Sequence, residues 1–219
     1  MKEATGSELE LLQAQLIAQA EKVMQALAVS TNQGNDAGLG TELFDSFLRH
    51  YFDASVLQEF QGHEPAQLCA MACGHWLLAG GRARGEARVR VYSPEQAIHG
   101  WSSPHVVIEV VADDMPFLVD SVSMSVRDAG GVINTLLHPV VQVRRDANGV
   151  AREVMAPSTQ SEGGQAESYI QIQCMGLVQN PDELEQTIQA VLQDVLVVVK
   201  DYDAMQQRVE DTVALMDER

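Results

Sequence analysis

The sequence predicts an α+β protein, in which a helical first part precedes an antiparallel sheet with helices on one face. Two changes of pattern predict this class. Up to about residue 80, apolar residues recur every three or four positions, as on the buried side of amphipathic helices. From Arg88 onwards several short segments have an apolar period of two, as in strands, and helical patterns lie between them. We therefore expect a helical subdomain over residues 1–84, an α+β domain over 85–200, and a helix over 201–219 that leads towards a further domain.

Composition limits the possible functions. The chain has 219 residues, with 14 Lys and Arg against 31 Asp and Glu, which gives a net charge of -17. Such a surface repels phosphate backbones, so we expect no nucleic-acid partner. No apolar stretch approaches the roughly 20 residues that cross a bilayer, and the acidic, amphipathic N-terminus is not a secretion signal. Three cysteines make no disulfide framework, so the cytoplasm is the expected compartment.

Three helices are expected in the first part. A second helix should begin at Thr41, a good N-cap, and a third should follow Pro65. The polar stretch "STNQGNDAGLG" separates the first two, and "AGGRARGEA" (79–87) indicates a linker or domain boundary. The apolar stripe of the first helix consists of Leu9, Leu12, Leu16, Ala20, Val23, Met24 and Leu27; the other two helices should bury Leu43, Phe44, Phe47 and Leu48, and Leu68, Met71, Ala72 and Leu78.

The α+β part reads as strand, strand, helix, three strands and a helix. "RVRVY" alternates like an edge strand, whereas "VVIEVV" is nearly continuously apolar, like a central strand. "DANG" predicts a hairpin between "VINTLLHPVVQVRR" and "VAREVMAP". "STQSEGGQAE" is polar and expected to be mobile, and "SYIQIQCM" alternates again. Asn180 to Glu183 predict the start of a last helix, in which "VLVVVK" is compatible with either a helix or a final strand.

The segment "VVIEVVADDMPFLVDSV" turns from a strand into a predicted helix over residues 115–129. Asp114 can cap this helix, and Pro116 costs no hydrogen bond in a first turn. Two interpretations remain open: a good helix start, or a ligand site. The exposed N–H groups at such a corner bind carboxylates, and Asp113 or Asp114 can meet an amino group, so an amino acid is the ligand class that fits.

The other polar residues give weaker evidence for a functional site. Asp120 fits a solvated helix face, His138-Pro139 fits an edge position or a bulge, and one of Arg144 and Arg145 should pair with an acid. We interpret His138 as structural. Cys69 and Cys73 share a helix face, but His75 points elsewhere and no fourth ligand follows, so buried cysteines are expected rather than a metal site.

Two resemblances follow from these motifs. The unit "VVIEVVADDMPFLVDSVSMSVRDAGGVIN" resembles the start of an ACT domain, a βαββαβ module that senses amino acids. "DMPFLVDSV" followed by "LLHPVVQVRRDANG" resembles the N-terminal region of the large bacterial NAD-specific glutamate dehydrogenases. The resemblance implies a non-catalytic regulatory or assembly region, with NAD and the reaction of glutamate to 2-oxoglutarate and ammonia belonging to the rest of the enzyme.

The resemblance also implies a ligand site at Asp114, Met115, Pro116, Phe117 and Asn134, with an amino acid as effector. Two features depart from the ACT pattern. Phe117 stands where ACT domains often have glycine, so its ring is expected to fill the pocket. No fourth ACT strand follows the last helix, and "RVRVY" is expected to supply it by lying antiparallel to residues 105–111.

The expected partners are the other domains of the parent enzyme and further copies of the chain. Two alternatives remain. One is a structural module without a ligand, whose open sheet face packs on its neighbours. The other is an independent enzyme that uses His138 with Asp120 or Ser121.

Overall fold

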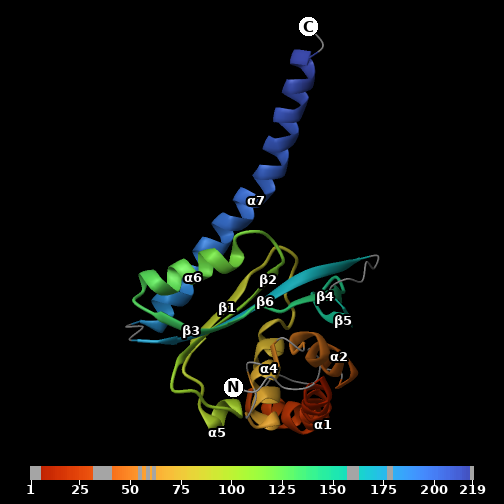
Figure 1. Cartoon of the computed structure of the whole chain (residues 1–219), viewed down its shortest axis with the longest axis vertical. Helices are drawn as coiled ribbons and strands as arrows, with labels where there is room; N and C mark the ends of the chain where they lie inside the picture. The colour runs from red at the N-terminus through yellow and green to blue at the C-terminus, as the bar shows by residue number, and fades with distance from the viewer. Residues whose placement is uncertain are drawn as a thin grey trace.

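The protein forms three layers in the computed structural model, which describes residues 6–31, 41–53, 56–57, 60, 63–156, 163–176 and 180–217. A six-stranded antiparallel sheet lies in the middle, with helices α1, α2 and α4 on one side and α6 and α7 on the other (Figure 1). The α+β class and the order of helices before sheet are thus confirmed. None of the described helices is long and apolar enough to cross a membrane.

The N-terminal layer contains the three predicted helices, α1 (Gly6–Thr31), α2 (Thr41–Tyr51) and α4 (Pro65–Leu78). The predicted starts of α2 and α4 are confirmed, and Pro65 occupies the first turn of its helix, where a missing N–H costs nothing. Residues 32–40, the predicted polar loop, lie outside the described residues. Most of the predicted stripe residues are in the core, namely Leu9, Leu16, Ala20, Met24, Phe44, Phe47, Leu48, Leu68, Met71 and Ala72. Leu12, Val23, Leu43 and Leu78 are partly buried against it, and the side chain of Leu27 lies outside the described residues.

The sheet has the order β1-β2-β6-β4-β5, with β3 also paired to β6. The strand "RVRVY" is β1 and pairs antiparallel with β2, with Val89 opposite Val110, so its predicted place beside β2 is confirmed. The strands are β1 (Arg88–Tyr92), β2 (Val106–Asp113), β3 (Val132–Leu137), β4 (Val140–Arg145), β5 (Ala151–Met155) and β6 (Gly164–Met175). The remaining helices are α5 (Gln96–His99), α6 (Leu118–Asp128) and α7 (Pro181–Asp217).

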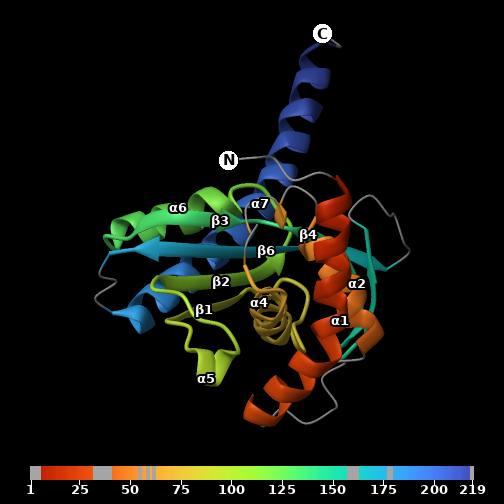
Figure 2. The same cartoon turned by 60° about the horizontal axis from the view of Figure 1, so that its bottom comes forward.

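Both faces of the sheet are buried within this one chain (Figure 2). On one face Val107 and Val111 belong to the same core as Phe47 and Trp76 of the N-terminal helices. On the other face the core includes residues of α6 and α7, as predicted: Ile108, Val110, Val122, Val126, Ile188 and Leu192. The expectation that the first face stays open for another domain or subunit is therefore wrong, because the chain's own helices cover it. The nearly continuous apolar run of β2, which is buried from Val107 to Ala112, fits a strand covered on both sides.

The second half of the chain corrects two further expectations. β6 begins at Gly164, so the end of the polar stretch "STQSEGGQAE" is strand, while residues 157–162 lie outside the described part. Its burial is nearly continuous instead of alternating, because helices cover both faces. "VLVVVK" belongs to α7, which settles the choice between helix and strand.

The edge position of His138-Pro139 and the hairpin after Arg145 are confirmed, whereas the single strand expected from "VINTLLHPVVQVRR" is divided into β3 and β4. His138 and Pro139 lie on the sheet edge, since β3 pairs only with β6, and the Pro139 carbonyl accepts from the Tyr169 N–H at 2.9 Å. The hairpin between β4 and β5 is held by Asp146, whose Oδ1 accepts from the backbone N–H groups of Asn148 at 2.9 Å and Val150 at 3.0 Å. Such a side-chain bond to the following backbone is typical of aspartate at a turn.

Candidate functional site

The strand–helix corner differs from its prediction. Helix α6 begins at Leu118, three residues later than expected, and its N-cap is Phe117, without a side-chain cap. Asp114 does not cap the helix. Its N–H donates to the Ala166 carbonyl at 2.8 Å, and its Oδ1 accepts from the Ser168 hydroxyl at 2.6 Å. The corner therefore stays attached to β6 for one residue past β2, and only then turns into the helix.

Phe117 adopts the left-handed backbone conformation, with φ 72°, and is the non-glycine residue at positive φ among the described ones. Glycine adopts this conformation without strain, whereas in another residue it costs roughly 1–2 kcal/mol of conformational free energy. The backbone at Phe117 therefore has a conformation that favours glycine, although the residue is phenylalanine. The ring is 60% exposed, so the expectation that it fills a pocket is wrong.

Asp113 and Asp114 are neighbours that engage opposite faces of the sheet. Asp113 accepts from Arg82 Nη1 at 2.7 Å and from the Gly85 N–H at 2.8 Å, on the side of the N-terminal helices. Asp114 bonds to Ser168 on the other side, and His138 Nε2 lies 3.0 Å from the same Ser168 hydroxyl. The hydroxyl donates to Asp114, so it accepts from His138. Only Asp114 keeps one carboxylate oxygen, Oδ2, without a hydrogen bond to any described residue.

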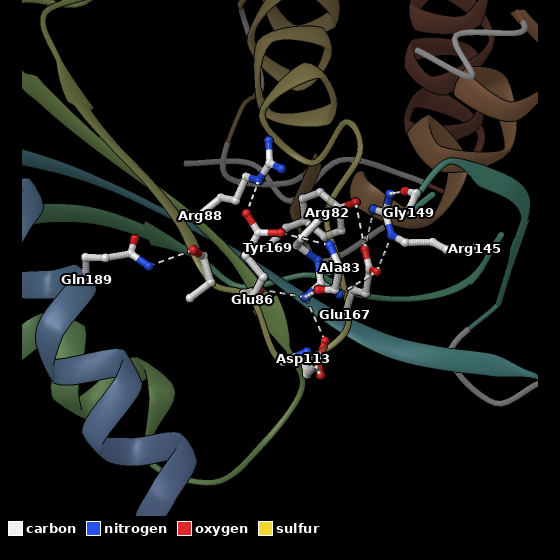
Figure 3. Close-up of polar contacts among 12 residues, drawn as sticks. Arg82, Ala83, Glu86, Arg88, Asp113, Arg145, Gly149, Glu167, Tyr169 and Gln189 are labelled. Carbon is white, nitrogen blue, oxygen red and sulfur yellow. Dashed lines mark hydrogen bonds and ion pairs between the residues drawn. The ribbon is translucent and has the colours of Figure 1, made fainter. Parts of the chain in front are cut away.

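Arg82 is the centre of the polar contacts drawn in Figure 3. Its side chain is 1% exposed, and its Nη2 donates to Glu167 Oε1 at 2.6 Å. Arg145 binds the same carboxylate through Nε at 2.7 Å and Nη2 at 2.8 Å. Burial lowers the pKa of Arg82, but Glu167 and Asp113 outweigh this and raise its pKa above the ordinary value, so the guanidinium stays charged. The segment "AGGRARGEA" is thus fixed to the ends of β2 and β6 instead of acting as a free linker.

The hairpin turn between β4 and β5 packs tightly on this segment. A Cβ at Gly149 would lie 2.6 Å from the Arg82 carbonyl oxygen, closer than any side chain tolerates. Gly149 also has φ 77°, and its carbonyl accepts from Arg145 Nη1 at 2.7 Å. Glycine is required here for both the conformation and the close approach.

A second buried network joins α2 and α4 to the sheet. Tyr51 Oη lies 3.0 Å from His75 Nδ1, and His75 Nε2 lies 3.1 Å from the Val110 carbonyl. A carbonyl only accepts, so Nε2 carries the proton and Nδ1 accepts from Tyr51. Burial lowers the pKa of His75, which agrees with this neutral ring. Glu109, which is fully buried, accepts from Tyr92, Gln171 and Arg90.

The predicted ligand residues border two different cavities. Met115 borders a small cavity of about 70 Å³ beside α7. Asn134 borders another, of about 480 Å³, between α4 and the loop at Trp101. Positions along β6 measure the distance between the two places. Asp113, next to the corner, pairs with Glu167, whereas Ile133, next to Asn134, pairs with Cys174. These partners are seven residues apart on β6, which at about 3.3 Å per residue is roughly 23 Å. The structure therefore brings Asp114, Met115, Pro116 and Phe117 together, but not Asn134.

The other predicted residues lie as follows. Asp120 is exposed, as expected. Arg144 forms an exposed pair with Glu153 at 3.0 Å, while Arg145 makes the buried pair. Cys69 and Cys73 are buried, as predicted, and burial raises the pKa of both thiols to about 12.

Three residues of these polar networks, Arg82, Glu167 and Ser168, were not among the residues predicted from the sequence. Arg82 lies in a glycine-rich stretch that reads as a linker, and no local signal marks it. Glu167 could have been found, because the period of two in "SYIQIQ" extends back by one residue to place it on the face of Tyr169 and Gln171.

Comparison with known proteins decides the family. The family model for the glutamate dehydrogenase ACT1 domain matches residues 47–192, from α2 to α7. The chain belongs to this family. The match covers the sheet, the corner and Arg82, and it crosses residue 84, so the predicted division at that residue stays a prediction.

Relatives of this ACT1 domain include two enzymes named NAD-specific glutamate dehydrogenase. The one from Pseudomonas aeruginosa is 33% identical over 167 residues, which cover 75% of the chain and 10% of the relative. The one from Halomonas elongata is 30% identical over 164 residues, with 74% and 10% covered. The chain thus spans about a tenth of the length of these relatives.

Proposed function

We propose that the chain is a non-catalytic regulatory region of an NAD-specific glutamate dehydrogenase, the enzyme that converts glutamate to 2-oxoglutarate and ammonia. One observation carries the proposal: the match to the ACT1 domain spans residues 47–192. The antiparallel pairing of β1 with β2 supports it, because β1 takes the place of the fourth strand of an ACT-like sheet. The other domains of the parent enzyme are the expected partners.

The arrangement of polar side chains supports a non-catalytic role. His138 contacts Ser168 rather than Asp120 or Ser121, and Ser168 is fully buried with its proton directed at Asp114. A serine nucleophile needs the reverse, an exposed hydroxyl whose proton goes to the histidine. The corner does not fit NAD either, because it carries two aspartates and no glycine where a pyrophosphate would approach. NAD is therefore expected to bind elsewhere in the parent enzyme.

Within this role, we propose that the corner senses a free amino acid. Asp114 is exposed and has Oδ2 available for an amino group, while Met115, Pro116 and Phe117 surround the turn. Asn134 is too far from the corner to share this ligand and would act only from another copy of the chain.

A structural role without ligand is the second candidate, and exposed apolar residues favour it. Phe117, the N-cap of α6, and Met124 within α6 are each 60% exposed, and Val197, Val198 and Tyr202 of α7 are each 57% exposed. The C-terminal part of α7 extends from the rest of the fold (Figure 1). Such exposed apolar residues are typical of surfaces that pack on another domain or subunit.

Kinetics of the full-length protein that contains this chain test the proposal. We expect one or two amino acids to change the rate of glutamate oxidation, and Asp114→Asn to weaken that response while the rate without effector is kept. Asp120→Asn, an exposed aspartate on α6, is the matched control. A response that is identical in both variants would contradict sensing at the corner, and no response to any amino acid would favour the structural role.

A further inference from the structure

A pocket of about 310 Å³ lies beside Arg82. It lies between the segment after α4, the hairpin turn of β4 and β5, and the start of β6. Its polar lining consists mainly of Arg82, Arg84, Arg145, Asp146, Gln165 and Glu167. The volume is at the lower end of the range for small-molecule sites.

The charges around this pocket leave one cation without a partner. Arg145 and Arg82 share Glu167, Arg82 also binds Asp113, and Asp146 pairs with Arg152 at 2.6 Å. Those three arginines therefore balance three carboxylates.

The remaining arginine, Arg84, is exposed, and the described part of the chain offers it no ion pair or hydrogen bond. A locally positive pocket in a chain of net charge -17 is an unusual feature that attracts anions.

Arg82 itself is incompletely satisfied. Its Nη1 and Nη2 both make hydrogen bonds, yet its buried Nε has no hydrogen-bond partner among the described residues. An unsatisfied buried donor is costly, and a native structure rarely leaves one without a reason. A ligand oxygen that enters the pocket beside Glu167 is one way to supply the missing acceptor.

We propose that this pocket binds the carboxylate of a small organic acid or amino acid, between Arg84 and Arg82. Guanidinium groups bind carboxylates through short, charge-assisted hydrogen bonds in a fixed geometry. The pocket has room for a ligand such as glutarate or glutamate and none for a dinucleotide. The proposal deepens the regulatory function and rests on it for its biological role. Arg82 would connect the two places, since it contacts both the pocket and Asp113 at the corner.

Titration calorimetry of the 219-residue chain tests this proposal, with glutarate and L-glutamate as probes at constant ionic strength. We expect saturable binding of at least one probe and a loss of affinity of about tenfold or more in Arg84→Gln. Arg84 is exposed and unpaired, so this variant should fold and melt like the wild type. Arg127→Gln removes another exposed arginine, on α6, and should bind like the wild type.

Three results would overturn the assignment: no binding of either probe, equal affinity in Arg84→Gln and the wild type, or equally tight binding of inorganic phosphate. The experiment distinguishes a failure of the carboxylate pocket from a failure of the proposed regulatory function. An amino acid whose binding depends on Asp114 but not on Arg84 would contradict the carboxylate pocket and keep sensing at the corner. Binding that depends on Arg84 without any effect on glutamate oxidation would keep the pocket and contradict the regulatory role.

Discussion

Arg82 donates to Glu167 across 85 positions of sequence, at 2.6 Å, and both side chains are 1% exposed. This ion pair ties the segment after the N-terminal helices to the central strand of the sheet. Arg145 and Asp113 complete it from β4 and β2, so four separate parts of the chain meet at one charged centre. Removal of one member of a buried pair typically costs about 3–5 kcal/mol, because the partner stays buried without compensation.

Arg82→Met is therefore expected to lower the free energy of unfolding by about 3 kcal/mol or more. Arg145 still partly compensates Glu167, which keeps the loss near the low end. Urea denaturation measures it, and Arg144→Met is the control, because its pair with Glu153 is nearly half exposed and should contribute under about 1 kcal/mol. Equal losses in the two variants would show that the Arg82 network does not hold the layers together.

Gly149→Ala should destabilise the protein more than Gly130→Ala. Both glycines have positive φ, 77° and 83°, so both variants pay the conformational strain of about 1–2 kcal/mol. Only at Gly149 does the new Cβ meet backbone, at 2.6 Å from the Arg82 carbonyl, whereas nothing lies within 4 Å at Gly130. Thermal melting compares the two, and similar losses would place the hairpin turn away from the Arg82 segment.

Phe117→Gly should raise the free energy of unfolding by about 1 kcal/mol, because it relieves strain and gives up little burial. Phe117→Ala is the control, since it removes the exposed ring but keeps the strain. A gain in stability with both substitutions, or with neither, would contradict the strained turn.

The fold should lose stability as the pH falls from 7 to 5. Burial lowers the pKa of His75 in the folded state, so the unfolded chain binds more protons below about pH 6.5, and protonation favours unfolding. Burial lowers the pKa of His138 and of His50 in the same direction.

His75→Gln should therefore make the free energy of unfolding depend less on pH in this window, by at most about 1.4 kcal/mol per pH unit, while the other histidines keep part of the slope. Unfolding curves at pH 5, 6 and 7 measure the change. An unchanged or steeper slope in the variant would mean that His75 is not held neutral in the fold.

Acid below about pH 4.3 should remove a further contribution. Burial raises the pKa of Glu109, but the Arg90 charge and the hydrogen bonds from Arg90 and Tyr92 outweigh this and lower the pKa, so its stabilising charge is lost only as the pH falls through the lowered value. Glu109→Gln should flatten the dependence of stability on pH below that point. A variant with the same acid dependence as the wild type would assign the loss to other carboxylates.

Local patterns in the sequence predict most of the elements, but not how they meet. The stripes of α1, α2 and α4 and the alternation in β1 identify their elements because one face of each is apolar. The predicted start of α6 is wrong, because the hydroxyl of Ser168, 54 residues away, binds the Asp114 carboxylate that would otherwise cap the helix. The burial of Arg82 could not be predicted for the same reason. Its partners are distant in the sequence, and nothing in the glycine-rich stretch around it indicates that its charge is buried.

The most direct test of amino-acid sensing is a thermal-shift panel of free amino acids against this chain. A ligand at a hundred times its dissociation constant stabilises the fold by about 2.7 kcal/mol, which for a domain of this size raises Tm by several degrees. We predict such a shift for one or two amino acids, and its loss in Asp114→Asn. No shift for any amino acid, from a chain that melts cooperatively, would contradict sensing and support the structural role.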